Sequence, residues 1–371
     1  MRHTTIPFKV AGTKHERAGN HSAALTRSPP MPPLRLHFCD FGTARSGQLI
    51  IDFFKSLILP KYDVTLDGAA PDYVIYYMLG HEHLNHNCVR IYFTGENVCP
   101  DFNLCDYAIG SSPISFGDRY YRYPYYGILK DQHERLVRSR TFTAEDLRKK
   151  TNFCNFIYSN SFLPTDPTRD AFFHLLSRYK RVDSVGQHLN NLREAIGDPY
   201  QGAWYETKVE YQRKYKFTIA FDNSSVPGYT TEKITHAFLA NTIPIYWGNP
   251  DVSLDFNPRA FINVFDFPNL DAVVDRVREI DANDDLYLQI LNEPPYKNNE
   301  LPAALQRDNI GHFLDNIFRR PKELARRRPK YGYGPLYEGD IREMAMAKRY
   351  QKYNLLGRAL RMSTRLTARQ H

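Results

Sequence analysis

Cysteine is scarce in this chain, with 5 among 371 residues. No two cysteines form a CxxC pair, and their odd number leaves one without a partner. This usage excludes both a zinc knuckle and a disulfide framework, and it fits a reducing compartment best. The five positions are Cys39, Cys88, Cys99, Cys105 and Cys154.

Long hydrophobic runs are also missing. No apolar run approaches the roughly 18 residues of a transmembrane helix, and the first residues lack the apolar centre of a secretory signal peptide. Residues 1–33 are polar and end in the proline-rich run SPPMPP. Such a composition predicts a disordered leader over residues 1–33.

Regular metal-ligand spacing is absent as well. His81, His83 and His86 lie close together, but only Glu82 accompanies them, so a polar loop is favoured over a metal site. The closely spaced acids of residues 281–285 do not follow an apolar strand and are interpreted as a helix N-terminus. The sequence therefore predicts no metal ligands.

Positive charge is concentrated in the tail. The whole chain carries a net charge of +8, and residues 319–371 hold 15 basic against 4 acidic side chains, which leaves the remainder slightly acidic. After a predicted linker over residues 331–339, Met344, Leu356 and Leu360 recur among the basic residues and predict an amphipathic helix. Its apolar face argues against nucleic-acid binding. Contact with an anionic membrane surface and packing onto the first domain both remain open.

Two series of alternating strands and helices are expected. Residues 34–38, 62–66 and 73–79 have strand patterns, and residues 49–59 have helical spacing. A second series begins with strand 153–158, helix 166–180 and strand 181–185, after a charged segment over 130–150 that is predicted to be helical. The pattern indicates an α/β protein with two domains.

The most informative segment covers residues 217–250. A short apolar strand is followed by a polar loop, a helix with Ile234, Ala237 and Phe238 on one face, and a buried strand over 242–247. A helix that follows such a loop offers free N–H groups to an anion. Lys233 in its first turn opposes the helix dipole unless an anion binds there, although local physics alone favours a solvated surface lysine. Glu232 is favoured at a helix N-terminus in any case.

Two motifs resemble the family 10 glycosyltransferases, the alpha-1,3/1,4-fucosyltransferases. The first is Phe221-Asp222-Asn223 followed by Tyr229-Thr230-Thr231-Glu232-Lys233, which resembles the donor-binding motif of that family. The second runs from Arg90 to Asn97 and continues through residues 100–110, and it closely matches the bacterial members. The resemblance extends over about residues 34–316.

The resemblance implies the GT-B fold, in which two Rossmann-like α/β domains face each other across a cleft. The expected divisions are the leader at 1–33, an acceptor-binding domain at 34–150, a donor-binding domain at 151–318, and the basic amphipathic tail at 319–371. Animal members of the family carry a membrane anchor and stem, so this chain is expected to be a bacterial, cytoplasmic version. Contact of the tail with the inner face of the membrane is a further expectation.

Glu96 is the expected general base. It follows a predicted strand, where a carboxylate projects into the ligand crevice of an α/β sheet, and the family resemblance implies this role. A sugar hydroxyl is a poor nucleophile until a base accepts its proton. A local turn hydrogen bond is the alternative role for Glu96, and Asp101 and Asp106 are alternative bases.

The resemblance further implies that Asn223, Tyr229, Glu232 and Lys233 bind the donor. On the acceptor side it points to Asp118, Arg119 and Tyr120 in a Tyr-rich loop, for which packing between domains is an equally good explanation. Some bacterial relatives have a donor-contacting arginine where this chain has Leu189, and Arg181 and Arg193 are the candidate substitutes.

The implied reaction is inverting transfer of L-fucose from GDP-beta-L-fucose to a hydroxyl of an N-acetyllactosamine-type glycan, with the 3-hydroxyl of GlcNAc or glucose expected. The acceptor is expected to be an oligosaccharide or lipopolysaccharide. No cofactor is expected to be required, with a divalent cation at most as a stimulator. The competing hypotheses are a GT-B enzyme for another sugar nucleotide and a glycan-binding protein with an inactive donor site.

Overall fold

The computed structural model describes residues 33–42, 45–137, 141–159, 165–194, 196 and 204–353. The predicted leader, apart from Pro33, and the tail beyond residue 353 lie outside these ranges. Within them, no helix is both long enough and apolar enough to cross a membrane.

The first half of the chain builds a six-stranded sheet in the order β2-β1-β3-β4-β5-β6. All neighbouring strands are parallel, so their carboxyl ends lie at one edge, where α/β proteins bind ligands. The strands are β1 (Leu34–Cys39), β2 (Val64–Leu66), β3 (Tyr73–Tyr76), β4 (Val89–Phe93), β5 (Tyr107–Gly110) and β6 (Tyr120–Arg122).

The second half builds a five-stranded sheet in the order β11-β10-β9-β7-β8, again with parallel neighbours. Its centre is apolar on both faces, as expected for a parallel sheet covered by helices. The prediction of two α/β domains is thereby confirmed. The strands are β7 (Asn152–Phe156), β8 (Val182–Ser184), β9 (Tyr215–Phe221), β10 (Ile243–Trp247) and β11 (Ile262–Asn263).

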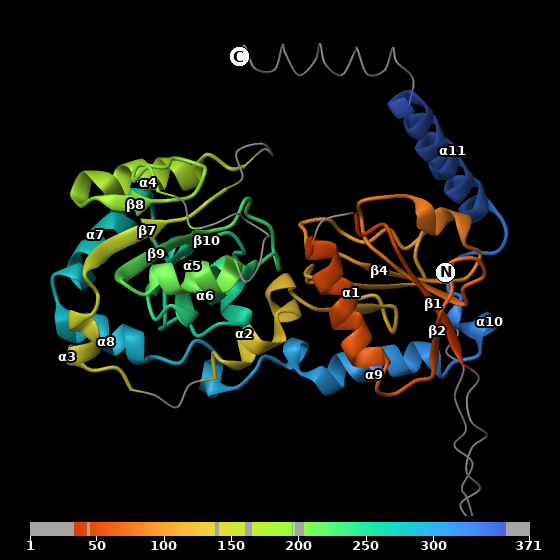
Figure 1. Cartoon of the computed structure of the whole chain (residues 1–371), viewed down its shortest axis with the longest axis horizontal. Helices are drawn as coiled ribbons and strands as arrows, with labels where there is room; N and C mark the ends of the chain where they lie inside the picture. Colours follow the sequence, from red (N-terminus) through yellow and green to blue (C-terminus); the bar gives the residue numbers. More distant parts are fainter. Residues whose placement is uncertain are drawn as a thin grey trace, which may run out of the picture. The chain divides into compact units, whose positions relative to one another are not determined.

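Helices cover both sheets (Figure 1). The long helices associated with the first sheet are α1 (Arg45–Ile58) and α9 (Arg307–Phe318), which contact each other. The helices grouped around the second sheet are α4 (Thr168–Tyr179), α5 (Trp204–Gln212), α6 (Glu232–Leu239), α7 (Leu270–Asp281) and α8 (Asp284–Asn292). The ring of Phe318 in α9 packs edge-on against Tyr62 and Tyr73, so the chain returns to the first core before the predicted boundary at residue 318.

Helix α6 forms where its apolar spacing predicts. Ile234, Ala237 and Phe238 are buried, and the helix contacts β9 and β10. Thr231 precedes the first turn in an extended conformation, and Asn241 just beyond the last turn has a φ of 56°. Asparagine tolerates this left-handed conformation, which ends many helices. Strand, loop, helix and strand of the central segment are all confirmed.

Two predicted elements differ from the structure. Residues 130–150 hold two short helices, α2 (Lys130–Glu134) and α3 (Ala144–Arg148), because Thr143 and Asp146 form a capping box that starts α3 afresh. The predicted linker at 331–339 instead contains the start of α11 (Tyr333–Tyr353). Glu338 attaches this segment to the first domain, since it pairs with the buried guanidinium groups of Arg90 and Arg328.

Polar and aromatic contacts connect the two halves. Arg122 at the end of β6 donates two hydrogen bonds to the carboxylate of Asp255, at 2.9 and 2.6 Å. The ring of Tyr126 lies 5.1 Å from that of Phe256, which in turn stacks on Phe238 of α6. A bidentate ion pair and a continuous aromatic cluster therefore hold α6 against the first sheet.

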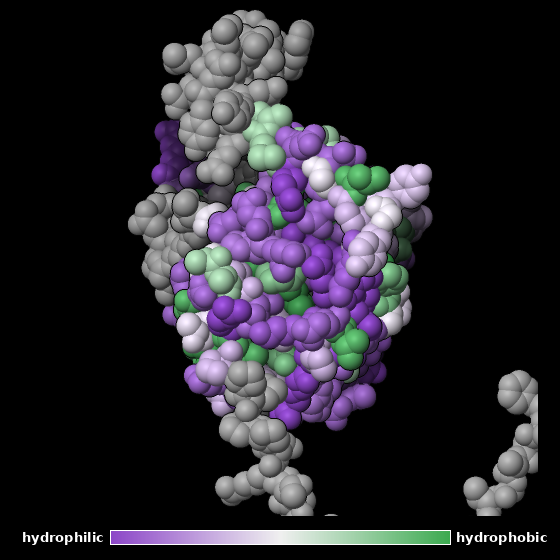
Figure 2. Space-filling view, turned by 90° about the vertical axis from the view of Figure 1, so that its right-hand side faces the viewer, coloured by the Kyte–Doolittle hydropathy of each residue, from purple (hydrophilic) through white to green (hydrophobic). Residues whose placement is uncertain are grey.

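The face of the molecule nearest to β1, β2 and α10 (Lys322–Ala325) is mostly hydrophilic (Figure 2). Its hydrophobic residues form small, separate groups. Scattered apolar groups of this kind are ordinary on a protein surface.

Candidate active site

A cavity of about 380 Å³ lies at the carboxyl ends of strands from both sheets. Residues after β1, β3 and β4 form one side, and the loop after β9 with the first turn of α6 forms the other. The cavity contains acidic, basic and aromatic side chains together. The residues that line the cavity include Phe41, Tyr77, Leu79, Glu96, Tyr125, Trp204, Tyr205, Asn223, Tyr229, Thr231, Glu232 and Lys233.

Glu96 enters the cavity from the end of β4. The chain passes close to an aromatic ring here, because a Cβ on Gly95 would lie 2.1 Å from Tyr125. The Glu96 amide donates to Thr94 Oγ1 over 3.1 Å, which fixes the backbone of the turn. Its carboxylate accepts a hydrogen bond from the Tyr229 hydroxyl at 3.2 Å. The tyrosine therefore orients the carboxylate across the cavity.

Tyr229 is held by the glycine before it. Gly228 has a φ of +81°, and a Cβ there would lie 2.2 Å from the Ser111 carbonyl oxygen, so only glycine fits this crossing. The Gly228 amide donates to Asn249 Oδ1 over 2.7 Å. Burial, together with the nearby Glu96 carboxylate, raises the pKa of Tyr229, which therefore remains a neutral hydrogen-bond donor.

Asp222 organises the loop from beneath. Its carboxylate is buried and accepts hydrogen bonds from the hydroxyls of Thr231 and Tyr246. Burial raises the pKa of Asp222 to about 6, against the opposing effect of the Lys233 ammonium group. The motif aspartate thus fixes the start of α6.

Lys233 and Glu232 form the charged end of α6. Lys233 Nζ donates to Thr231 Oγ1 at 3.1 Å and lies 3.8 Å from Asp222 Oδ1. Burial lowers the pKa of Lys233, but the carboxylates of Glu232 and Asp222 more than offset this and raise it. Burial also opposes ionisation of Glu232, yet Lys233 and Lys208 lower its pKa to about 2. Both groups are therefore charged at neutral pH.

The position of Lys233 decides between the two explanations that the sequence left open, a solvated surface lysine and a lysine that receives an anion. The Lys233 side chain is only 15% exposed, which excludes a freely solvated surface lysine. A largely buried cation at a helix N-terminus, next to free backbone N–H groups, can receive an anionic ligand.

Lys208 is a second cation in this region, and the sequence analysis missed it. It belongs to α5 and is buried, and its burial lowers its pKa to about 8, with Glu232 acting in the opposite direction. His236 in α6 is also buried, and burial lowers its pKa to about 3. It therefore stays neutral and adds no charge to the cluster.

Arg169 is a third residue, after Lys208 and His236, that was not predicted from the sequence. It lies in α4, is 1% exposed, and its guanidinium group sits 4.7 Å from the centre of the Tyr158 ring. Nη1 is buried and has no hydrogen-bond partner among the described residues. Its charge acts on Lys233, whose pKa it lowers, so the two cations face the same region. A buried donor without a partner is costly, unless a ligand supplies the acceptor.

The structure brings together five of the predicted site residues, Glu96, Asn223, Tyr229, Glu232 and Lys233, around one cavity. The alternative bases lie elsewhere. Asp106 is buried and bonded to Arg328, while Asp101 accepts a hydrogen bond from Tyr337.

The three predicted acceptor-side residues do not line this cavity. Asp118 pairs with Arg320 and Arg327. Arg119 donates to main-chain carbonyl groups and stacks on two phenylalanine rings. Tyr120 belongs to β6 and donates to the Ser112 carbonyl at 2.8 Å. Each therefore has a packing role.

Leu189 stands where a donor-contacting arginine was considered in the sequence analysis. Its side chain packs against the core of the second sheet. The substitutes suggested by the sequence do not line the cavity either. Arg181 pairs with Asp183, and its side chain is 64% exposed. Arg193 is exposed.

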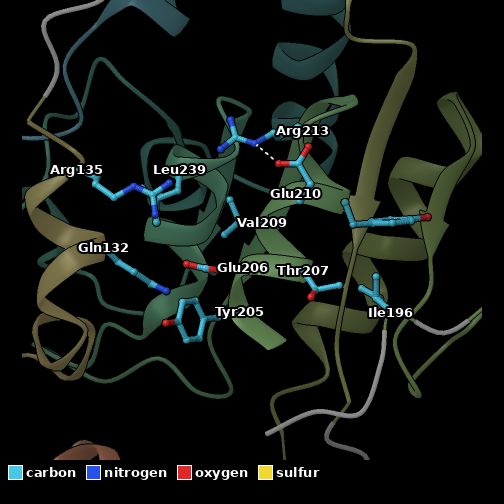
Figure 3. A pocket seen from close by; sticks show the side chains of 11 residues that line it. Gln132, Arg135, Ile196, Tyr205, Glu206, Thr207, Val209, Glu210, Arg213 and Leu239 are labelled. Carbon is cyan, nitrogen blue, oxygen red and sulfur yellow. Dashed lines mark hydrogen bonds and ion pairs between the residues drawn. The ribbon is translucent and has the colours of Figure 1, made fainter. Parts of the chain in front are cut away.

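A larger cavity, of about 730 Å³, lies between α2 and α5 (Figure 3). Gln132 and Arg135 come from the α2 side, while Glu206, Val209 and Glu210 come from α5. Its lining lacks the combination of Glu96, the α6 N-terminus and Lys233, so the smaller cavity is the candidate active site. Tyr205 borders both cavities.

Comparisons with known proteins agree with this geometry. The alpha-(1,3)-fucosyltransferase FucT N-terminal domain matches residues 36–129, and the C-terminal part of glycosyltransferase family 10 (fucosyltransferase) matches residues 147–293. The alpha-(1,3)-fucosyltransferase FucT of Helicobacter pylori is 34% identical over 313 residues, 73% of this chain. This chain spans 61% of that relative's length.

Solved structures of alpha1,3-fucosyltransferase share the fold. The structure with GDP-fucose has a TM-score of 0.62 at 26% identity, covering 81% of this chain and 94% of the other. The structure with GDP has a TM-score of 0.64 at 27% identity, covering 84% and 96% respectively. The two facing α/β domains are thus the GT-B arrangement. The chain belongs to glycosyltransferase family 10, the fucosyltransferases.

Proposed function

We propose that this protein is an inverting alpha-1,3-fucosyltransferase, which moves L-fucose from GDP-beta-L-fucose to the 3-hydroxyl of GlcNAc or glucose in an N-acetyllactosamine-type glycan. One observation carries the proposal. The Glu96 carboxylate, from the first sheet, and the Lys233 ammonium group, from the second, line the same cavity. This arrangement supplies a proton acceptor on one side and a cation for a leaving diphosphate on the other.

Glu96 would act as the general base. The acceptor hydroxyl becomes a sufficient nucleophile as its proton passes to the carboxylate during attack on the fucose C1. The Tyr229 hydrogen bond holds the carboxylate in place, so little reorganisation is needed at that moment. A single displacement inverts the anomeric centre and requires no nucleophile from the enzyme.

Lys233 and the N-terminus of α6 would stabilise the negative charge that grows on the departing GDP. Fixed cations and N–H groups contribute most where charge develops in the transition state. Asn223, Tyr229 and Glu232 would hold the pyrophosphate, ribose or fucose. Arg169, with its unpartnered Nη1, is the strongest candidate for a second phosphate contact.

The relatives support GDP-fucose as the donor, because one solved alpha1,3-fucosyltransferase of this fold contains GDP-fucose and another contains GDP. We assign donor binding to residues 151–318, apart from α9, which packs on the first core, and acceptor binding to residues 34–150. We also propose that the reaction requires no cofactor, with a divalent cation at most as a stimulator.

The acceptor would be an oligosaccharide or lipopolysaccharide in the cytoplasm of a bacterium. The tail at 319–371 would provide peripheral contact with the inner face of the membrane, and nucleic acid is not a partner. Met344 and Met346 in α11 are about half exposed, which supports an apolar contact there. The first part of α11 also packs on the first domain, through Glu338 and through Arg342, which donates to the Leu84 carbonyl.

A donor-competition assay tests the proposal. The full chain would be incubated with lactose or N-acetyllactosamine and labelled GDP-fucose, with GDP-mannose, UDP-galactose and UDP-glucose as competitors. We expect an alpha-linked fucosyl product and inhibition by GDP-containing compounds only. Transfer from another sugar nucleotide would favour a different GT-B enzyme. Acceptor binding without GDP binding would favour the glycan-binding alternative.

A further inference from the structure

A group of three potential metal ligands lies outside the catalytic cavity. His37 belongs to β1, while Glu82 and His86 belong to the short helix η1 (Glu82–Asn85) and the residue after it. One nitrogen from each histidine and one carboxylate oxygen of Glu82 lie within 4.8 Å of one another. We propose that these three side chains bind a divalent transition-metal ion of the zinc class.

The distances are close to those of a tetrahedral site. His37 Nε2 lies 2.8 Å from Glu82 Oε1, and His86 Nε2 lies 3.8 Å from the same oxygen. Ligand atoms about 2.0–2.1 Å from a tetrahedral ion are about 3.3 Å apart. Side-chain rotations that move the ligand atoms by about one ångström or less therefore suffice to surround an ion. Water would be the fourth ligand.

His86 provides the observation that points most directly to a ligand. Its side chain is 12% exposed, and Nε2 is buried without a hydrogen-bond partner among the described residues. A buried imidazole nitrogen usually has a partner, since leaving it unsatisfied is costly. A metal ion between His86 and Glu82 would supply that partner.

The backbone that carries Glu82 and His86 is fixed from below. Asp40 accepts the amide hydrogens of Glu82 and His83, at 2.9 and 3.1 Å, and contacts His83 Nδ1 at 2.6 Å. The His86 carbonyl accepts two hydrogen bonds from the buried guanidinium group of Arg90. Such supporting contacts position the ligands of protein metal sites.

The third ligand, His37, is confined on the sheet. Its ring lies 5.2 Å from that of His86 in an edge-to-face arrangement. A Cβ on Gly68 would lie 3.2 Å from His37 Cε1, so the glycine leaves just enough room for the ring. The imidazole is held beside its partners before an ion arrives, which reduces the entropy cost of binding.

The ligand set indicates the class of ion. Two imidazoles with one carboxylate suit Zn²⁺, Co²⁺ or Ni²⁺, whereas Mg²⁺ and Ca²⁺ prefer oxygen ligands. The Glu82 side chain is 52% exposed, which provides a route for the ion from solvent.

The site would act on structure and not on the chemical step, because none of the three ligands lines the catalytic cavity. Asp40 connects the two places: its side chain fixes η1, and its carbonyl accepts from the amide of Leu79 in the cavity wall, at 3.2 Å. A bound ion would stabilise the loop between β3 and η1.

The experiment uses the full chain after treatment with a chelator, titrated with ZnCl₂ by calorimetry. The variants are His86→Gln and Glu82→Gln, and the matched control is His81→Gln, an exposed neighbour in the same loop. Histidines elsewhere in the chain are unchanged in all four proteins, so any zinc that they bind is common to all.

We expect the wild type and His81→Gln to bind one more Zn²⁺ than the other two variants, or to bind it at least tenfold more tightly. Saturating ZnCl₂ should raise the Tm of the first pair only, and excess MgCl₂ should not compete. Equal stoichiometry, affinity and Tm response in all four proteins would overturn the proposal. Circular dichroism confirms folding, and the result does not depend on fucosyl transfer.

Discussion

The hydroxyl of Tyr229, in the loop before α6, donates a hydrogen bond over 3.2 Å to the carboxylate of Glu96 at the end of β4. The bond joins the donor motif of the second sheet to the proposed base of the first. Tyr229 is 3% exposed, whereas Glu96 is exposed, so the tyrosine is the fixed, buried partner of this bond. The buried tyrosine thus orients the Glu96 carboxylate.

Tyr229→Phe should lower kcat about ten- to a hundredfold, because a hydrogen bond to a charged group contributes about 1.5–3 kcal/mol. GDP affinity should change less than about twofold, since the ring remains. Tyr205→Phe, which removes a hydroxyl from the same cavity wall, is the control and should retain nearly full activity. Equal activity of Tyr229→Phe and wild type would show that the bond has no role in turnover.

Lys233→Met should reduce kcat/KM by about a hundredfold or more, because a fixed cation at the leaving diphosphate is lost. Lys208→Met should have a smaller effect, since Lys208 is not among the residues that line the cavity and its charge acts on Glu232. Steady-state kinetics and calorimetry with GDP measure both. Equal losses in the two variants would contradict the assignment of Lys233 as the direct contact.

Arg169→Gln should weaken GDP binding about tenfold if its unpartnered Nη1 meets a phosphate oxygen. Arg181→Gln and Arg193→Gln are matched controls that remove the same charge from exposed positions, and both should bind GDP like the wild type. Calorimetry with GDP gives the comparison. A loss of GDP binding in either control, with none in Arg169→Gln, would assign the missing arginine to that control position, before or after β8.

Asp222→Asn should change the pH dependence of stability. The folded-state pKa of about 6 lies above the ordinary value of 3.8, so the folded protein binds more protons between these pH values. The Asp222 contribution to the free energy of unfolding therefore falls as the pH rises from about 4 to 7, by about 3 kcal/mol.

Asparagine does not titrate. The stability of Asp222→Asn relative to wild type should therefore increase by about that amount across the same range, as measured by urea unfolding at several pH values. A difference between the two proteins that is independent of pH would contradict a raised pKa of Asp222.

Local sequence patterns predicted the parts of the site that one continuous segment builds. Ile234, Ala237 and Phe238 share a buried face, which placed α6 and with it Glu232 and Lys233 at the helix start. The strand before Glu96 was likewise predicted from one continuous segment. Periodicity within one segment suffices when a single helix or strand carries the functional group.

Contacts between distant segments could not be predicted in this way. Arg169 and Lys208 reach the donor region from α4 and α5, and no spacing within the sequence connects them to Lys233. The histidines of the loop at 81–86 were interpreted as a polar loop because a further ligand, His37, lies 45 residues before Glu82 in the sequence. Pairing of β1 with β3 brings these segments together.

Glu96→Gln gives the most direct test of the proposed reaction. The amide keeps the size of the side chain and an oxygen that can accept the Tyr229 hydrogen bond, but it cannot take up the acceptor proton. Fucosyl transfer to N-acetyllactosamine should fall about 10²–10⁴-fold. Binding of GDP-fucose should stay within about twofold of wild type. Transfer at the wild-type rate by a folded Glu96→Gln protein would contradict the assignment of Glu96 as the base.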